Sequence, residues 1–375
     1  MAVLIFAEPR DSHAAAAKWG LRQLGTKVKH IAFTDFPKRL AVAIRPSRPL
    51  SVILQGLGVE EDFSDVSTVW FRRFSDAQLP AGMHDSDRRY ALRDWDHIQN
   101  YIHQAQELRQ IRSINPPSSS RTRDLKPFQL DLANRCGLRI PETIITNDVH
   151  IILEFIKTNE ASGSKTIVKS LDPMAWVRNT GQVYSLPTQI VTAKDVLGAD
   201  ASSAPLIYQR YVEKAFEVRL TVMGRTAVAA KLNSQSFESS KIDFRRVLDW
   251  RSLGCEEIIP PQDVIESVFE FMTRSKLAFG TMDFAVTPDG EWVFFENNEQ
   301  GNFLWVERAN PNVPILDCFV RFLHSNESNF VYRRSDAHRL RLSDYSIYVE
   351  QNKQELEKEA ASFTSVSPPN YMTDH

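Results

Sequence analysis

The segment at residues 281–298 (TMDFAVTPDGEWVFFENN) places the strongest constraint on how this chain can fold. Two runs rich in β-branched and aromatic residues flank the sequence TPDG at positions 287–290. Proline suits the second position of a four-residue turn, and glycine can take the left-handed conformation at its end. The segment therefore predicts two antiparallel strands joined by a tight turn, with Val286 opposite Glu291.

This register gathers oxygen-bearing side chains on one face of the predicted hairpin. Asp283 falls opposite Phe294 and diagonally beside Glu296, and Asn298 joins them because side chains alternate along a strand. The other face is expected to be apolar and to carry Phe284, Val293 and Phe295. Two carboxylates this close on a half-buried surface are unfavourable unless a cation lies between them.

Asp283, Glu296 and Asn298 are therefore a candidate metal site. Hard oxygen ligands without histidine or cysteine favour magnesium over zinc. The alternative is a solvated face of an edge hairpin, since a register slip of one residue would remove Asp283 from the group. Spacing alone leaves both interpretations open.

Glycine is scarce in this chain, which limits how it could bind a nucleotide. The sequence holds 14 glycines in 375 residues, roughly half of a typical share of about 7%. Neither G-x-G-x-x-G nor G-x-x-x-x-G-K-[ST] occurs, and these are the loops in which glycine lets the backbone approach phosphate. Any nucleotide phosphates would have to be held in another way.

Three lysines on separate elements offer such a way. Lys126 stands at a predicted helix start, where backbone N–H groups already favour anions. Lys169 lies inside an apolar strand pattern, and Lys231 ends another. Each alone is more often a solvent-facing residue. Together with an acidic metal site, the three become candidates for binding a triphosphate without a glycine loop.

The first hundred residues alternate strand and helix signals. Strand patterns occur at residues 3–6, 29–33 and 68–71. Asp11 and Ser12 can start a helix that stops at Gly25. This β-α-β order predicts a small domain with a parallel sheet.

A long helix is predicted near residues 86–108. Its apolar positions form one stripe with 4-3-4-3 spacing: Ala91, Trp95, Ile98, Ile102 and Ala105. Core packing is the favoured interpretation of this stripe, and a dimer seam is the alternative.

The sequence NPPSSS at residues 115–120 is the clearest break in the chain and predicts a domain boundary. A helix is expected from Lys126 to Cys136, and Asp263 with Glu266 has the spacing of a capping box at the start of another. Residues 351–375 combine a charged helical pattern with a Ser/Pro tail that we expect to be mobile.

Charge and cysteine content exclude several classes of protein. The net charge of −2 gives no basic field that would attract nucleic acid. Cys136, Cys255 and Cys318 are far apart and odd in number, as expected of reduced thiols. The longest apolar runs are too short to span a membrane, and the N-terminus reads as a strand rather than a signal peptide. We therefore expect a cytoplasmic protein.

Several ordered motifs resemble those of a known family. FGTMDFAVTPDGEWVFFENNEQGNFLW closely resembles the C-terminal metal-binding signature of ATP-grasp enzymes, and IVKS, YQRYVEKAFEVRLTVMG and AAKLNSQSFESSKIDFRR resemble its other motifs. The finer similarity is to the ribosomal peptide maturases that make microviridins and other graspetides. Their "inP" before the first lysine, "kinSQ...DwR" and "ENpqGqfLW" sequences all have counterparts here. The resemblance covers about residues 110–325 strongly and residues 1–75 loosely.

The resemblance implies an α/β (α+β) chain with the ATP-grasp fold. It implies an N-terminal parallel-sheet pre-ATP-grasp domain over residues 1–115 and a central and lid subdomain over 121–208. The C-terminal nucleotide- and metal-binding subdomain would cover 209–325, followed by a polar extension over 326–375. Dimers are usual in the resembled family, so a homodimer is possible, although no interface can be read from the sequence.

The resemblance also implies roles for individual residues. Lys126, Lys169 and Lys231 would contact the phosphates of ATP, with Lys169 on a mobile lid. The backbone of Arg210, Tyr211 and Val212 would read adenine, and Glu217 would lie near the ribose. Asp283, Glu296 and Asn298 would hold Mg²⁺. Arg219, Asp243 and Arg245 would grip the acidic side chain that is activated.

The implied activity is an ADP-forming ligase. It would phosphorylate Asp or Glu side chains of a ribosomal precursor peptide, which has a leader and a core, and close macrocycles through ω-ester or ω-amide bonds. Phe244 within the DWR-like motif and Glu299 in place of a proline depart from the family pattern. Two alternatives stay open: a ligase that adds free amino acids to a peptide or small carboxylate, and a non-catalytic ATP-binding regulatory protein.

Overall fold

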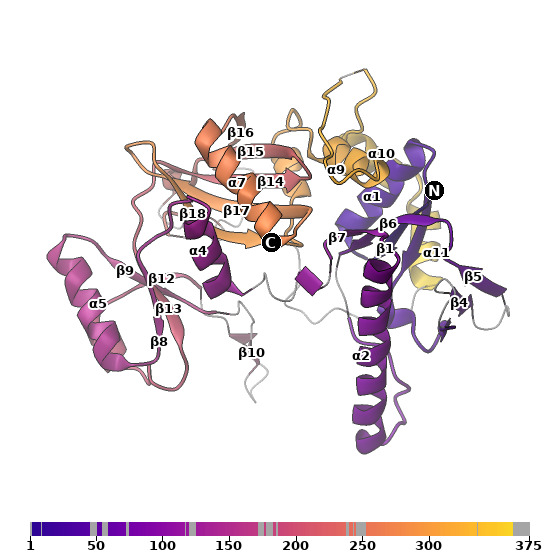
Figure 1. Ribbon diagram of the computed structural model, residues 1–375, viewed down its shortest axis with the longest axis horizontal. Coiled ribbons are helices and arrows are strands. Elements are labelled where there is room, and N and C mark those ends of the chain that lie inside the picture. Colours follow the sequence, from indigo (N-terminus) through magenta and orange to yellow (C-terminus); the bar gives the residue numbers. More distant parts are fainter. Residues whose placement is uncertain are drawn as a thin grey trace.

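The structure is a computed structural model of the chain. It describes all residues except 1, 9, 46–50, 55–58, 73–74, 117, 120–124, 172–175, 178–182, 185–186, 238–239, 243, 245–252, 336 and 363–375. Figure 1 shows three sheet-containing parts in a row, with a five-stranded sheet in the middle and the N-terminal sheet at one end. The chain is a mixed α/β protein, as predicted.

The N-terminal part is built on a four-stranded parallel sheet in the order β2-β1-β6-β7. Its strands are β1 (Ala2–Phe6), β2 (Lys27–Ile31), β6 (Val66–Phe71) and β7 (Arg112–Ile114). Helix α1 (Ser12–Gln23) joins β1 to β2, with the Asp11 carboxylate accepting the Ala14 N–H at its start and Gly25 at φ +71° after its end. The predicted β-α-β order is confirmed.

Smaller elements and one long helix complete this part. A three-stranded antiparallel sheet contains β3 (Leu40–Ala43), β4 (Ser51–Leu54) and β5 (Val59–Asp62), preceded by the 3₁₀ helix η1 (Phe33–Asp35). Helix α2 (Asp85–Leu108) extends away from the body in Figure 1. Its Ile102 and Ala105 are buried, and Trp95 and Ile98 pack on the same core. The apolar stripe thus packs in the core along the C-terminal part of the helix.

The central part contains the antiparallel sheet β12-β9-β13-β8. Its strands are β8 (Thr143–Thr146), β9 (Thr166–Lys169), β12 (Gln189–Val191) and β13 (Leu206–Arg210). Helices α5 (Val149–Ala161) and α6 (Ala193–Leu197) pack on it through Ile152, Ile156 and Val196. A short hairpin of β10 (Trp176–Val177) and β11 (Val183–Tyr184) lies between β9 and β12 in the sequence.

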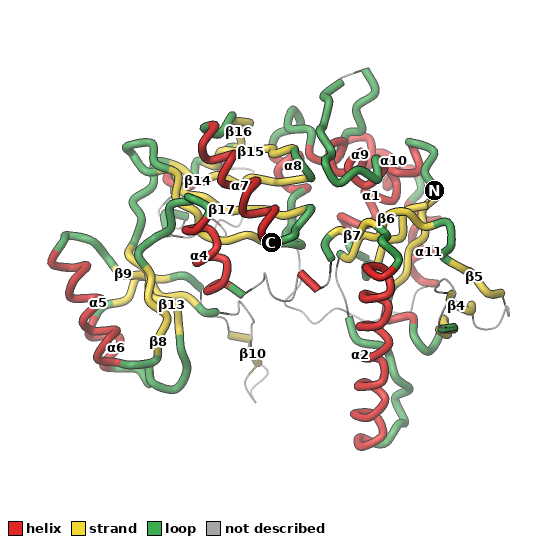
Figure 2. The backbone as a smooth tube through the Cα atoms, viewed as in Figure 1, coloured by secondary structure: helices red, strands yellow, loops and turns green. Residues whose placement is uncertain are grey.

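The middle sheet is antiparallel in the order β16-β15-β14-β17-β18. Its strands are β14 (Phe216–Met223), β15 (Thr226–Leu232), β16 (Cys255–Ile258), β17 (Phe279–Val286) and β18 (Trp292–Asn298); the 3₁₀ helix η2 (Ser234–Ser236) follows β15. Helices α4 (Lys126–Arg135) and α7 (Gln262–Ser275) cover one face, as Figure 2 shows. Helix α7 begins after Pro261 with no side-chain cap, so the predicted capping box at Asp263 is wrong.

The C-terminal helices attach the middle sheet to the N-terminal one. They are α8 (Leu304–Ala309), α9 (Ile315–His324), α10 (Leu342–Gln351) and α11 (Lys353–Ser362). One apolar core contains Val3 and Trp19 of the N-terminal part together with Phe279 and Phe319. Helix α11 confirms the helical pattern predicted near residue 351, whereas the Ser/Pro tail lies outside the described residues.

The predicted break at residues 115–120 contains a buried anchor. Asn115 is 2% exposed, and its amide donates to the carbonyls of Phe279 and Glu299. Its Oδ1 accepts the N–H groups of Ala278 and Phe279. The first residue of this segment therefore fastens the end of β7 to β17.

The cysteines are free thiols, as the sequence predicts. Cys136, Cys255 and Cys318 are free, and burial raises the pKa of each thiol, that of Cys255 to about 11. Within the described residues, no helix has both the length and the apolar character that crossing a bilayer requires.

Candidate functional site

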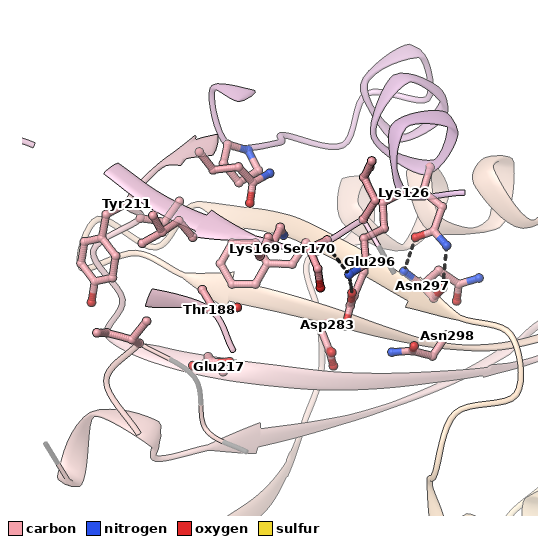
Figure 3. Close-up of a pocket in the computed structure, with 18 of the residues that line it drawn as sticks. Lys126, Lys169, Ser170, Thr188, Tyr211, Glu217, Asp283, Glu296, Asn297 and Asn298 are labelled. Carbon is pink, nitrogen blue, oxygen red and sulfur yellow. Dashed lines mark hydrogen bonds and ion pairs between the residues drawn. The ribbon is translucent and has the colours of Figure 1, made fainter. Parts of the chain in front are cut away.

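A cavity of about 810 Å³ lies between the central and middle sheets. Residues from α4, β9, β13, β14, β17 and β18 line it, so segments far apart in the sequence meet there. Nine of the predicted site residues are among them: Lys126, Lys169, Arg210, Tyr211, Val212, Glu217, Asp283, Glu296 and Asn298. Figure 3 shows Tyr211 at one end and Asp283, Glu296 and Asn298 at the other.

The hairpin of β17 and β18 forms with a register different from the predicted one. Val286 pairs with Trp292 rather than Glu291, and a bulge between Phe284 and Asp283 leaves Phe295 unpaired. Asp283 consequently lies directly opposite Glu296, not diagonally beside it. Without the bulge, Asp283 would face Phe295 and Glu296 would point to the other side.

The changed register at the turn corrects the predicted position of Phe295. Its ring lines the cavity, with the Lys169 ammonium 5.9 Å from the ring centroid. Phe284 belongs to the core on the other face of the sheet, where it packs against Phe294 and Trp292. The predicted register placed Phe295 on the face of Phe284, whereas the observed pairing of Phe284 with Phe294 puts Phe295 on the opposite face.

Each carboxylate of the candidate metal site has a cationic neighbour. Arg219 Nη1 donates to Asp283 Oδ1 at 2.6 Å, and both side chains are less than a tenth exposed. Lys126 Nζ is 3.8 Å from Glu296 Oε2 and donates to the Ser170 carbonyl at 3.2 Å. These contacts offset the repulsion between the two paired carboxylates.

The donor set suits magnesium shared with a phosphate ligand. Asp283 and Glu296 supply carboxylate oxygens and Asn298 an amide oxygen, which are hard ligands for Mg²⁺. Among the described residues, no group of three or more His, Cys, Asp or Glu side chains could hold a metal by itself. A Mg²⁺ ion here would therefore take its remaining oxygen ligands from water and nucleotide phosphates.

Helix α4 holds strand β18 in place through a glutamine that was not among the predicted site residues. Gln129 is buried; its Nε2 donates to the Asn297 carbonyl, and its Oε1 accepts the Asn297 N–H, both at 2.8 Å. The two bonds fix β18 between Glu296 and Asn298. Since Gln129 and Lys126 are one turn apart on α4, the helix also carries the lysine to the site.

The far end of the cavity is formed by the segment after β13. The N–H of Arg210 donates to the Glu142 carbonyl, and that of Tyr211 donates to the Lys165 carbonyl. The Tyr211 hydroxyl donates to the Lys241 carbonyl at 3.3 Å. The segment that was predicted to read adenine is thus an ordered wall of the cavity that leads into β14.

Glu217 forms a buried ion pair that the sequence analysis missed. Lys214 Nζ lies 2.7 Å from Glu217 Oε1 and also donates to the Ile242 carbonyl. Burial raises the pKa of Glu217, and the Lys214 ammonium opposes that shift. The i, i+3 spacing of the two charges at the start of a strand was the available signal.

Of the described site residues, Arg219 and Lys231 are not among those that line the cavity; Arg219 lies beside it, against Asp283. Lys231 pairs with Val218, and directly opposite residues of an antiparallel pair share a face. Its ammonium lies 4.9 Å above the Phe216 ring, on the core side of the sheet, so the structure does not bring it to the cavity with Lys126 and Lys169. Asp243 and Arg245 lie outside the described residues.

The arrangement suits a ligand that carries phosphates, such as a nucleotide. The lysines and the hard-metal donor set suit phosphates, whereas the aromatic ring of Tyr211 at the other end suits contact with a flat ring. None of the described residues that line the cavity is a glycine.

Comparisons with known proteins agree on the architecture. The chain matches no protein-family model and no curated protein. It is similar to the macrocyclase MdnC from Microcystis aeruginosa MRC, solved with its precursor peptide MdnA: identity 23%, TM-score 0.73, covering 87% of this chain and 100% of that one. A RiPP-associated ATP-grasp ligase from Chryseobacterium gregarium, solved with ADP and a leader and core peptide, is 22% identical with TM-score 0.77, covering 91% and 100%.

A third similar structure is the ATP-grasp ligase PsnB with a phosphomimetic variant of its minimal precursor, Mg and ADP. It is 21% identical with TM-score 0.67, covering 87% of this chain and 98% of that one. The predicted fold is confirmed by these likenesses: the chain has the ATP-grasp fold.

Proposed function

Starting from the ATP-grasp fold, we propose that this protein is an ADP-forming ligase that activates Asp or Glu side chains of a ribosomal precursor peptide. It then joins them to Lys, Ser or Thr side chains of the same peptide as macrocyclic amides or esters. The observation that carries the proposal is the meeting of Lys126, Lys169 and the Asp283–Glu296 pair in one cavity.

ATP activates the substrate because a carboxylate is a poor electrophile. Transfer of the γ-phosphoryl group to a carboxylate oxygen releases ADP and gives an acyl phosphate. The amine or hydroxyl then attacks the acyl carbon, phosphate leaves, and the nucleophile loses one proton. One water is lost overall for each bond closed, and the protein needs no nucleophile of its own.

Residues of the cavity divide the work of this reaction. Lys126 and Lys169 would bind the transferring phosphoryl group, and Glu217 would lie near the ribose. Mg²⁺ held by Asp283, Glu296 and Asn298 would neutralise charge on the phosphates.

Arg219 is placed to hold the acidic side chain that is phosphorylated. It lies beside Asp283, and its Nε has no hydrogen-bond partner in the part of the chain that the structure describes. A buried guanidinium with a spare donor suits a carboxylate ligand. We propose the same role for Asp243 and Arg245. We also propose that the backbone of Arg210, Tyr211 and Val212 binds adenine.

The peptide substrate is inferred from the similar structures, which were solved with precursor peptides. We include in this proposal a leader segment that docks on the enzyme and a homodimeric assembly. We also include the division of the chain at residues 115, 208 and 325. We also place the reaction in the cytoplasm, because it consumes ATP and acts on a ribosomal peptide.

The test is to incubate the protein with ATP, Mg²⁺ and a precursor peptide encoded beside its gene. Release of ADP together with loss of one water mass per closed ring is the expected result. A mass gain equal to a whole amino acid would instead identify a ligase for free amino acids. ATP binding with no ADP release for any precursor would identify a regulatory protein.

A further inference from the structure

Arg72 is a buried arginine in the N-terminal part of the protein. It contacts residues 300–302, which follow strand β18. It stands at the carboxyl end of β6 and is 1% exposed. Its Nη1 donates to the Gln300 carbonyl and, at 3.4 Å, to that of Gly301; its Nη2 donates to Asn302 Oδ1 at 2.7 Å. Asp11, which caps α1, forms an ion pair with Arg72, with Asp11 Oδ2 3.2 Å from Arg72 Nε.

The segment that Arg72 holds also holds Arg219. The Asn302 carbonyl accepts a hydrogen bond from Arg219 Nη2 at 3.0 Å, and Arg219 Nη1 donates to Asp283 at 2.6 Å. A continuous chain of contacts therefore runs from the N-terminal sheet through Asn302 to the candidate metal site.

Packing around Gly301 leaves this segment little freedom. A Cβ atom there would approach Thr281 Oγ1 to 2.1 Å and Arg219 Nη2 to 2.8 Å. Displacing residues 300–302 would therefore displace the Arg219 guanidinium as well. His13 of α1 adds a second anchor, since its Nε2 accepts the N–H groups of Phe303 and Leu304.

We propose that Arg72 is a positioning residue, which fixes Arg219 beside Asp283 by holding the backbone of residues 300–302. The inference rests on the proposed function, in which Arg219 binds the substrate carboxylate. Arg72 is not among the described residues that line the cavity. It acts on the reaction because a shift of about 1 Å in a group that orients the substrate can slow turnover by about 100-fold.

Arg112 offers a matched control. It is also a largely buried arginine of the N-terminal sheet, and its Nη1 donates to the carbonyl of Phe322 at 2.9 Å while its guanidinium stacks on the Phe322 ring. Its contact joins the same two parts of the molecule but lies on α9 rather than on the segment that holds Arg219. Loss of either arginine removes a contact between these two parts of the molecule, and Arg72 makes more hydrogen bonds there than Arg112 does.

The experiment compares Arg72→Ala, Arg112→Ala and Arg219→Ala as full-length proteins. We expect Arg72→Ala to lower kcat for the precursor peptide about tenfold or more while KM for ATP changes less than about twofold. Arg112→Ala should keep kcat within about twofold, as expected of a contact remote from the reacting atoms. Combining Arg72→Ala with Arg219→Ala should add nothing to the loss caused by Arg219→Ala alone, because Arg72 acts through Arg219.

A second variant covers the case in which Arg72→Ala does not fold. Asn302→Ala removes one acceptor of Arg72 but keeps the backbone carbonyl that holds Arg219. It should show a smaller loss of kcat in the same direction. Additive losses in the double variant, or an equal loss in Arg112→Ala, would overturn the proposal.

Hydrogen exchange separates this inference from the proposed function. Arg72→Ala should speed amide exchange in the peptide spanning residues 299–305, and Arg112→Ala should leave that peptide unchanged. Should wild-type protein form no ADP with any precursor, the proposed function fails, yet the exchange result still decides whether Arg72 orders this segment. Unchanged exchange in Arg72→Ala would refute the positional link.

Discussion

The two faces of the middle sheet are built from the same strands but differ in chemistry. On one face, Glu217, Arg219 and Asp283 lie within or beside the cavity, and each carries a charge. On the other, Val218 and Phe284 pack under α4 and α7 in an apolar core. Neighbouring residues of one strand thus serve two environments that differ strongly in polarity.

This difference shows how the protein keeps charges inside a folded sheet. Arg219 has Asp283 as a partner, and Glu217 has Lys214, so the buried charges of the cavity face are paired. Lys231, on the core face, instead keeps its ammonium near Glu256 and above Phe216 at the edge of the sheet. The role of a charged residue in this sheet therefore depends on the face of the sheet to which its side chain points.

The largest expected effect lies on the core face. Phe284 is fully buried, with ring centroids of Phe294 and Trp292 both 5.6 Å away. Phe284→Ala should lower the free energy of unfolding by about 3–5 kcal/mol, because it leaves a cavity under α4 and α7. Urea denaturation measures this loss, while activity per folded molecule should fall little. A loss of turnover with unchanged stability would break the distinction between the faces.

The next effect lies at the metal end of the cavity. Glu296→Gln removes one of two carboxylates proposed to hold Mg²⁺ and should lower magnesium-dependent ADP release about 100-fold, with little change in stability. Steady-state assays at increasing Mg²⁺ would measure it. Unchanged ADP release would mean that the metal site is misassigned.

A smaller effect is expected from the lysine on β9. Lys169 lines the cavity beside Phe295, so Lys169→Ala should weaken ATP binding about tenfold by removing one charged contact with phosphate. Isothermal titration with a non-hydrolysable ATP analogue measures the affinity. If the affinity did not change, Lys169 would be a wall residue without a phosphate contact.

The smallest effect is expected from the lysine on the core face, which serves as the matched control for Lys169. Lys231→Ala should leave ATP affinity unchanged and change the free energy of unfolding by less than about 1 kcal/mol, since its ion pair with Glu256 is partly exposed. The same titration and a denaturation curve test both expectations. A tenfold loss of affinity would return Lys231 to the phosphate site.

Much of the fold could be predicted because its local signals agree with one another. The cap at Asp11, the turn at Gly290 and the strand around Lys169 all lie where composition and periodicity predict them. The predicted capping box of α7 was wrong because Asp263 lies inside the first turn of the helix rather than before it. Local patterns identify elements well and their terminal residues less well.

The candidate site was less predictable because its geometry depends on one residue of register. The sequence predicted a diagonal contact between Asp283 and Glu296, and a one-residue shift at the turn together with the bulge at Phe295 made it a direct pair. No composition signal marks that bulge, since Phe295 ends a continuous apolar run that begins at Trp292. The side of the sheet on which Lys231 lies was unpredictable for the same reason, because it follows from the pairing of Lys231 with Val218.

The sequence by itself determined the chemical types at the site: oxygen ligands on one hairpin, lysines on separate elements, and no glycine loop for phosphate. Only the tertiary structure decided which of these groups share a cavity, because strand pairing and the bulge set the face of each side chain. Contacts such as that of Arg72 with residues 300–302 join segments more than two hundred residues apart. A local pattern cannot encode such a contact, because it forms only when two separately folded sheets pack together.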